Sequence, residues 1–215
     1  MTAMYLSLSI HTTGPSLLHP LGEIGIAYGT NSDDVVKKRW AIRCTPETEA
    51  ALVSQMADYW QAEYKQTRWD RDELWNEVQA DPNIQSAKDV YIEVAQFLND
   101  ITAEFKGDCI WLSEGDSAEM NVLDFWLLTT GNRFLGCRFD VDGEDILVEN
   151  PFDTPEEDED AVEEVERLLK ESGLDEKQLL RSDDRAHLVL LRQFAVDKVQ
   201  SCCSSTDDET GSNQS

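Results

Sequence analysis

Apolar side chains in the first part of the chain fall into short runs that turn residues separate. Residues 4–10, 21–29 and 35–44 each have the length and apolar content of a β-strand. Gly14-Pro15 and the run Asn31-Ser32-Asp33-Asp34 mark the two turns. Because antiparallel strands can be joined by short connections, this segment is predicted to form an antiparallel meander.

Helical spacing of apolar residues begins after the third predicted strand. Thr45-Pro46 is typical of a helix start and predicts a helix to about residue 65. A second helix is predicted over residues 70–78. The clearest helix is predicted over residues 86–105, where apolar residues recur at i, i+4, i+7, i+8 and i+11: Val90, Val94, Phe97, Leu98 and Ile101.

The second half of the chain continues with alternating elements. A buried strand is predicted over residues 108–112, a helix over 117–128, and a strand or docking segment over 146–148. Residues 154–171 predict a very acidic helix, and residues 183–199 a final amphipathic helix. A meander followed by alternating helices and strands is the order of the ribonuclease H-like fold, an α/β fold with helices on both faces of a mixed sheet.

The length of 215 residues is typical of one domain with a tail. We expect the domain to span residues 1–200 and to include an acidic helical segment at 153–171. Residues 201–215 are rich in Ser, Asp and Thr and have no apolar periodicity, so they predict a flexible polar tail.

The charge balance is strongly acidic, with 44 acidic and 18 basic residues and a net charge of −26. Nucleic-acid affinity depends largely on Lys and Arg, so direct nucleic-acid binding is not expected, although Lys37-Lys38-Arg39 could form a local basic patch. The acidity is interpreted either as a solubility device or as a surface that mimics nucleic acid or binds a basic protein. The candidate partner-binding residues, for which a solvated helix face is the alternative, are Glu156, Glu157, Asp158, Glu159, Asp160, Glu163 and Glu164.

The cysteines and histidines show no zinc-site spacing, although the chain has five Cys and three His. Cys44, Cys109 and Cys137 lie in apolar stretches and are predicted to be buried thiols. This usage favours a reducing compartment, and no secretory signal or spanning segment is apparent. The expected location is cytoplasmic or intracellular, in the host cell if the protein is viral.

Two neighbouring segments resemble the start of DEDD-type 3′–5′ exonucleases, in which a strand ends in Asp-x-Glu-Thr-Thr-Gly and a strand with Ile-Gly follows. The corresponding residues are Ser9-Ile10-His11-Thr12-Thr13-Gly14-Pro15 and Leu21-Gly22-Glu23-Ile24-Gly25. Asp58-Tyr59-Trp60-Gln61 and Gly115-Asp116-Ser117-Ala118-Glu119 are similar to segments of phage exonuclease A and bacterial 3′–5′ exoribonuclease-like proteins. The resemblance covers residues 4–197. It implies a ribonuclease H-like fold and suits a phage or viral origin.

The chemistry of that family needs two divalent metals about 3.5–4 Å apart, held by carboxylates. By resemblance, Ser9 stands in place of the first Asp, His11 in place of the Glu, and Glu119 in place of the next Asp. If Ala186 matches the family's alanine, Asp184 and Val189 stand in place of the final His and Asp. The resemblance therefore implies a degenerate active site. The remaining candidate ligands are Asp116, Glu119, Asp183 and Asp184.

Ordinary structural roles remain open for these residues. Ser9 and His11 can be strand-end residues, and Asp116 and Glu119 can be caps that compensate a helix dipole. Three functions follow. The first is an exonuclease-fold protein that binds a basic or nucleic-acid-binding protein, with no metal cofactor and no membrane contact. The second is an active 3′–5′ exonuclease that uses Mg²⁺ or Mn²⁺ in a remodelled site, with His11 as base. The third is a structural role in a larger assembly.

Overall fold

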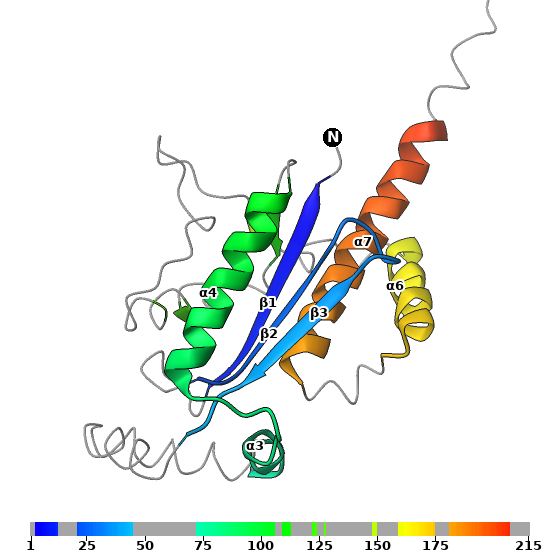
Figure 1. The fold of residues 1–215 in the computed structure, drawn as a ribbon. Helices are drawn as coiled ribbons and strands as arrows, with labels where there is room; N and C mark the ends of the chain where they lie inside the picture. The colour runs from blue at the N-terminus through cyan, green and yellow to red at the C-terminus, as the bar shows by residue number, and fades with distance from the viewer. Residues whose placement is uncertain are drawn as a thin grey trace, which may run out of the picture.

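The computed structural model describes residues 3–12, 21–44, 72–105, 109–112, 122–123, 127, 148–149, 159–174 and 181–206. Its strands form one mixed sheet of order β3-β2-β1-β4-β5 (Figure 1). They are β1 (Met4–Thr12), β2 (Leu21–Gly29), β3 (Val36–Ala41), β4 (Cys109–Leu112) and β5 (Val148–Glu149). β1, β2 and β3 are antiparallel, whereas β4 and β5 run parallel to β1. The predicted meander and the mixed α/β sheet are confirmed.

One face of the sheet packs against α4 (Ala87–Glu104). Alternate residues of a strand point to the same face, and on this face they are large and apolar, among them Leu6, Leu8, Ile24 and Ile26. They form a core with Val90, Val94 and Leu98 of α4. The helix begins after Ser86, whose side chain accepts a hydrogen bond from the backbone N–H of Asp89. The helix predicted over residues 86–105 is therefore confirmed.

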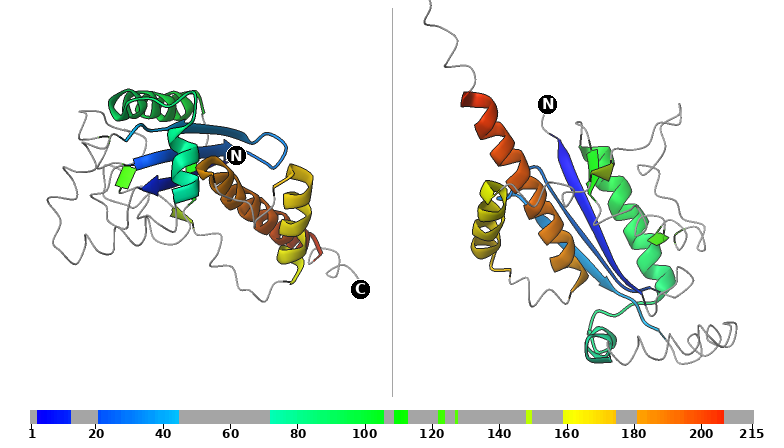
Figure 2. Two further views of the ribbon diagram at one scale, coloured as in Figure 1. Left: turned by 90° about the horizontal axis from the view of Figure 1, so that it is seen from below. Right: turned by 180° about the vertical axis from the view of Figure 1, so that it is seen from behind.

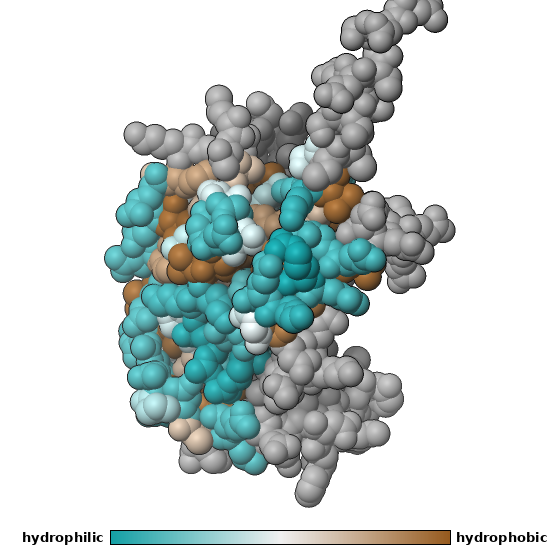
Figure 3. All heavy atoms as spheres, turned by 90° about the vertical axis from the view of Figure 1, so that its right-hand side faces the viewer, coloured by the Kyte–Doolittle hydropathy of each residue, from teal (hydrophilic) through white to brown (hydrophobic). Residues whose placement is uncertain are grey.

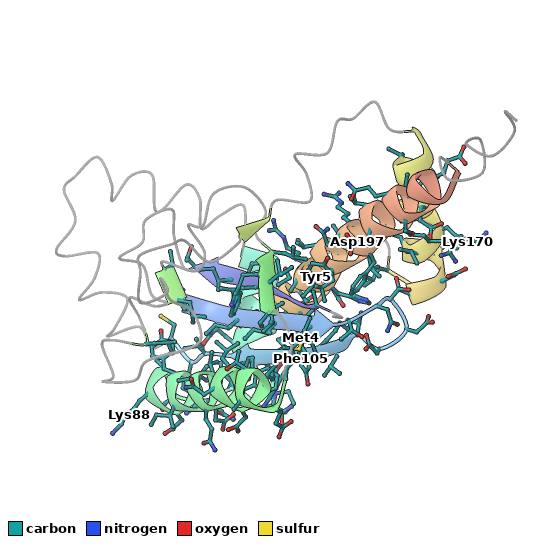
Figure 4. All side chains as sticks on the ribbon, turned by 90° about the horizontal axis from the view of Figure 1, so that it is seen from above. Met4, Tyr5, Lys88, Phe105, Lys170 and Asp197 are labelled. Carbon is teal, nitrogen blue, oxygen red and sulfur yellow. The ribbon has the colours of Figure 1, made fainter. Side chains whose placement is uncertain are left out.

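The opposite face of the sheet packs against α7 (Ser182–Thr206), so helices cover both faces (Figure 2). Several strand residues on this face are small or polar, such as Ser7, Ser9 and Ala27, whereas Tyr5 and Leu112 pack against α7 with larger side chains. Seen from above, Met4 and Tyr5 lie in the sheet, with Asp197 of α7 on one side and Lys88 and Phe105 at the α4 side (Figure 4). Small residues on the sheet allow the backbone of α7 to approach closely.

A second apolar core joins α7 to α6 (Glu159–Ser172), which lies against the outer side of α7. Leu168 and Leu169 of α6 pack with Leu188 and Leu191 of α7. The Lys198 ammonium of α7 also donates a hydrogen bond to Glu164 of α6 at 2.8 Å. The acidic helix is thus anchored to α7 along its apolar side.

Several predicted bounds shift. α3 (Asp72–Gln79) lies close to the second predicted helix, and residues 148–149 form a strand paired with β4 instead of a docking segment. α7 continues to Thr206, so residues 201–206, predicted as tail, are helical. The helix predicted at 46–65, Cys137, most of 117–128 and the remaining tail lie outside the described residues. None of the helices in the described ranges is both long and apolar enough to cross a membrane.

Candidate functional site

The positions that the exonuclease resemblance assigns to metal-binding acids lie where β1 and β2 meet the start of α7. Ser9 is paired with Gly25 across the strands, and His11 with Glu23. These residues share the face that α7 covers. Gly25 lies directly against the first peptide of α7, because a Cβ built on it would come within 2.1 Å of the Ser182 carbonyl carbon. The absence of a side chain at Gly25 therefore lets α7 begin beside Ser9 and His11.

Glu23 is the buried centre of this site, with a side chain that is 0% exposed. Its Oε2 accepts a hydrogen bond from the Ser182 backbone N–H at 3.0 Å and lies 3.1 Å from His11 Nδ1. Its Oε1 accepts a hydrogen bond from Arg39 Nη1 at 2.9 Å. Burial alone would raise the pKa of Glu23, but the contacts with His11, Ser182 and Arg39 outweigh it and lower the pKa to about 2. Glu23 is therefore a fixed negative charge.

Arg39 joins three carboxylates. Beside its bond to Glu23, its Nη2 donates to Asp81 Oδ2 at 2.8 Å, and its Nε lies 3.9 Å from Asp183 Oδ1. Burial would lower the pKa of Arg39, but the bond to Glu23 and the charges of the other two acids raise it. Arg181 is a second arginine near the same acids, with its Nη1 3.6 Å from Glu23 Oε1 and its Nη2 4.0 Å from Asp81 Oδ2. Two guanidinium groups thus neutralise Glu23 and Asp81.

The first turn of α7 adds two acids to the edge of the site. Acids at this position suit the positive end of the helix dipole. Burial and the neighbouring Asp184 raise the pKa of Asp183, with Lys37 and Arg39 opposing them. Asp184 forms a 2.7 Å ion pair with Lys37 of β3. Each of the two acids therefore already has a cation from β3 nearby.

The structure brings together only part of the site that the sequence predicts. Ser9, His11, Asp183 and Asp184 lie around the start of α7, as described above. Val189 lies in the apolar core between α7 and the sheet and is 3% exposed. Its hydrocarbon side chain has no donor atom for a metal. Asp116 and Glu119 lie outside the described residues.

The site residues predicted from the sequence do not include four charged residues that the structure places here: Glu23, Arg39, Asp81 and Arg181. The only signal for Glu23 is a carboxylate within an otherwise apolar strand, where a buried charge needs a partner. Its place directly opposite His11 could be inferred once the register of β1 and β2 was known. Asp81 and Arg181 lie in the connections that follow α3 and precede α7, and no pattern in the sequence places them at this site.

His187 of α7 is a further buried titratable residue near this site, 8% exposed. Its Nδ1 has no hydrogen-bond partner. Burial lowers the pKa of His187 to about 4; the charge of Lys37 acts in the same direction and that of Asp184 against it. His187 is therefore neutral near pH 7.

The predicted partner-binding acids are placed only in part. Glu163 of α6 is exposed, whereas the carboxylate of Glu164 accepts hydrogen bonds from Arg167 and Lys198. Glu159 and Asp160 lie on α6, and Glu156, Glu157 and Asp158 lie outside the described residues. The face of α6 and α7 is largely hydrophilic, with scattered apolar side chains (Figure 3). A role of these acids in partner binding stays a prediction.

The described part of the site does not fit a two-metal centre. Such a centre needs several carboxylate oxygens that converge on each cation. Here Ser9 supplies only a hydroxyl, and Arg39 occupies the space between the carboxylates of Glu23, Asp81 and Asp183. Within the described ranges, no three His, Cys, Asp or Glu side chains are grouped so that they could hold a metal ion.

Comparison with solved structures identifies the fold. A zinc-ion-bound form of E. coli exonuclease I in complex with single-stranded DNA matches 94% of the chain with a TM-score of 0.54 and 10% identity. E. coli exonuclease I with a 5cy-dT13 oligonucleotide matches 94% with a TM-score of 0.51 and 8% identity. Exonuclease I with the inhibitor BCBP matches 94% with a TM-score of 0.52 and 9% identity. This chain has the exonuclease fold.

The chain shares this fold with exonuclease I at low sequence identity, and it matches only part of each exonuclease I chain. The chain spans about 42% of the zinc-bound exonuclease I chain and 41% of the oligonucleotide complex. No protein-family model and no curated protein matches the sequence. The likeness therefore establishes the architecture alone, because one fold can carry many functions.

Proposed function

We propose that this protein uses the exonuclease fold to bind another protein and does not cleave nucleic acid by two-metal catalysis. The observation that carries the proposal is the guanidinium of Arg39, which bonds to buried Glu23 beside the Ser9 and His11 positions. A phosphodiester-cleaving centre needs positive metals held by free carboxylates. Here the chain's own cations already neutralise the acids at that place.

The charge of the molecule supports a protein partner over a nucleic acid. A net charge of −26 repels a polyanion, and Lys37 and Arg39 of the basic run on β3 are engaged with acids of this chain. An acidic surface that includes Glu163 would attract a basic or nucleic-acid-binding protein. Within the exonuclease fold, we propose that the chain is related to phage exonuclease A and bacterial exoribonuclease-like proteins, because residues 58–61 and 115–119 resemble segments of those proteins.

A nuclease assay tests the catalytic half of the proposal. Single-stranded DNA and RNA labelled at the 5′ end are incubated with the protein and Mg²⁺ or Mn²⁺, with exonuclease I as positive control for the DNA substrate. The expected result is no metal-stimulated shortening of either substrate. The decisive variant is Asp183→Asn/Asp184→Asn, since these acids are the described candidate ligands. Shortening by the unaltered protein that disappears in this variant would establish an active exonuclease with a remodelled site and refute the proposal.

A charge-reversal pair tests the binding half. Glu163→Lys/Glu166→Lys changes the exposed side of α6, and Asp100→Lys/Glu104→Lys makes the same charge change on α4. A partner is captured on the unaltered protein, identified by mass spectrometry, purified and titrated against all three proteins at several salt concentrations. We expect at least a tenfold weaker, less salt-dependent affinity for the α6 variant only. Equal affinities in all three proteins would place the interaction elsewhere.

A further inference from the structure

We propose that Glu23, Asp81 and Asp183 form an internal cation site, which the chain fills with the guanidinium group of Arg39. These three residues are called the carboxylate cluster below. They come from β2, from the connection after α3 and from the first turn of α7. The site therefore joins three separate parts of the fold through one planar cation.

The geometry assigns a different guanidinium nitrogen to each carboxylate. Nη1 is 2.9 Å from Glu23 Oε1, Nη2 is 2.8 Å from Asp81 Oδ2, and Nε is 3.9 Å from Asp183 Oδ1. A guanidinium group has five N–H donors in a fixed plane, so it can meet three acceptors on different sides. An ammonium is a compact point charge and lacks this spread of donors.

Burial makes a cation at this position necessary. The side chains of Glu23 and Asp81 are 0% and 6% exposed. Carboxylates this far from water repel one another strongly, and leaving one of them unpaired is costly. Arg181 contributes a second positive charge, but it lies 3.6 Å from Glu23 Oε1 and its Nη1 makes no hydrogen bond. Of the two guanidinium groups, Arg39 is therefore the one that makes hydrogen bonds to Glu23 and Asp81.

The carboxylate cluster favours a guanidinium over a divalent metal. Mg²⁺ and Ca²⁺ need oxygen ligands at about 2.0–2.6 Å from one centre. In this site the planar guanidinium bonds to Glu23 and Asp81 through separate nitrogens, and its third nitrogen lies 3.9 Å from Asp183. Glu23, Asp81 and Asp183 are not grouped so that they could together hold one metal ion. The inference concerns the occupant of the carboxylate cluster and does not depend on the protein-binding proposal.

Chemical rescue tests this inference on the full chain. Arg39→Ala is expected to lower the Tm by on the order of 10 °C, because it leaves buried carboxylates without their cation. Methylguanidinium at low millimolar concentration should restore most of that loss. Methylammonium, Mg²⁺ and Mn²⁺ should not. Arg167→Ala is the matched control, since Arg167 bridges Glu164 and Glu171 on the open surface of α6. Methylguanidinium should leave its Tm unchanged.

Three outcomes would overturn the inference: no rescue of Arg39→Ala by methylguanidinium, equal rescue by methylammonium, or equal rescue by Mn²⁺. If Arg39→Ala does not fold, Arg39→Gln receives the same additives, and the yield of folded protein after refolding from urea replaces Tm as the readout. A refolding yield that methylguanidinium does not raise also counts against it. The rescue is read without substrate or partner, so its failure is distinct from failure of the proposed function.

Discussion

Gly25 of β2 and Ser182 of α7 are in direct backbone contact. A Cβ on Gly25 would lie 2.1 Å from the Ser182 carbonyl carbon and 2.2 Å from the Asp183 nitrogen. The same approach lets the Ser182 N–H reach buried Glu23 at 3.0 Å. A single missing side chain therefore determines how closely the last helix lies on the sheet, and with it the geometry of the carboxylate cluster.

Gly25→Ala should destabilise the fold, because backbone atoms that a Cβ would overlap cannot move aside as a flexible side chain could. We expect a loss of about 3 kcal/mol in the free energy of unfolding, measured by urea denaturation. Gly173→Ala is the control: Gly173 has φ 72° and nothing within 4 Å of its Cβ position, so only backbone strain of about 1 kcal/mol is expected there. Equal losses in both variants would contradict the close contact.

Glu23 should make the protein sensitive to strong acid. Its pKa falls from an ordinary value of 4.5 to about 2 in the folded state. A lowered pKa adds stability that is fully present above about pH 4.5 and is lost as the pH falls toward 2. Glu23→Gln should be less stable than the unaltered protein at pH 7 by on the order of 3 kcal/mol. The difference in the free energy of unfolding between the two proteins should vanish near pH 2, as measured by urea denaturation at several pH values between 7 and 2. A constant difference would be inconsistent with this linkage.

His187 should produce a second, separate pH dependence. Its pKa is lowered from 6.5 to about 4 in the folded state, so between these values the unfolded chain binds a proton that the folded chain excludes. Stability should therefore decrease as the pH falls from 6.5 to 4, by on the order of 3 kcal/mol. His187→Gln should have a flatter profile over this window. The same slope in both proteins would mean that another group is responsible.

Glu164 offers a contrast with Glu23, because contacts with Arg167 and Lys198 lower its pKa to about 2 as well. Arg167 and Lys198, however, are 43% and 54% exposed, so water and salt screen these ion pairs. Glu164→Gln should therefore cost less than about 1 kcal/mol at pH 7, and the cost should shrink further in high salt. Urea denaturation at two salt concentrations measures both effects. A loss as large as that of Glu23→Gln would show that α6 is held mainly by charge.

Local patterns were sufficient to predict most elements of the fold. β2 begins and ends where its apolar run does, at Leu21 and Gly29, because a buried strand needs apolar side chains and a turn on either side. α4 follows its helical spacing and starts at the Ser86 cap. The end of α7 differs from the prediction: residues 201–206 show no apolar periodicity in the sequence, yet the helix continues through them.

The sequence by itself determined the order of elements, the acidic charge and the presence of Ser9 and His11 where the resemblance expects acids. Only the tertiary structure decided what surrounds those positions. The bonds of the site join residues far apart in the chain, 42 positions between Arg39 and Asp81 and 159 between Glu23 and Ser182. The spacing of apolar residues shows which side of its own helix or strand a residue faces, but it does not show which distant residue that side chain contacts. Strand register and the approach of α7 over Gly25 bring the acids and arginines together.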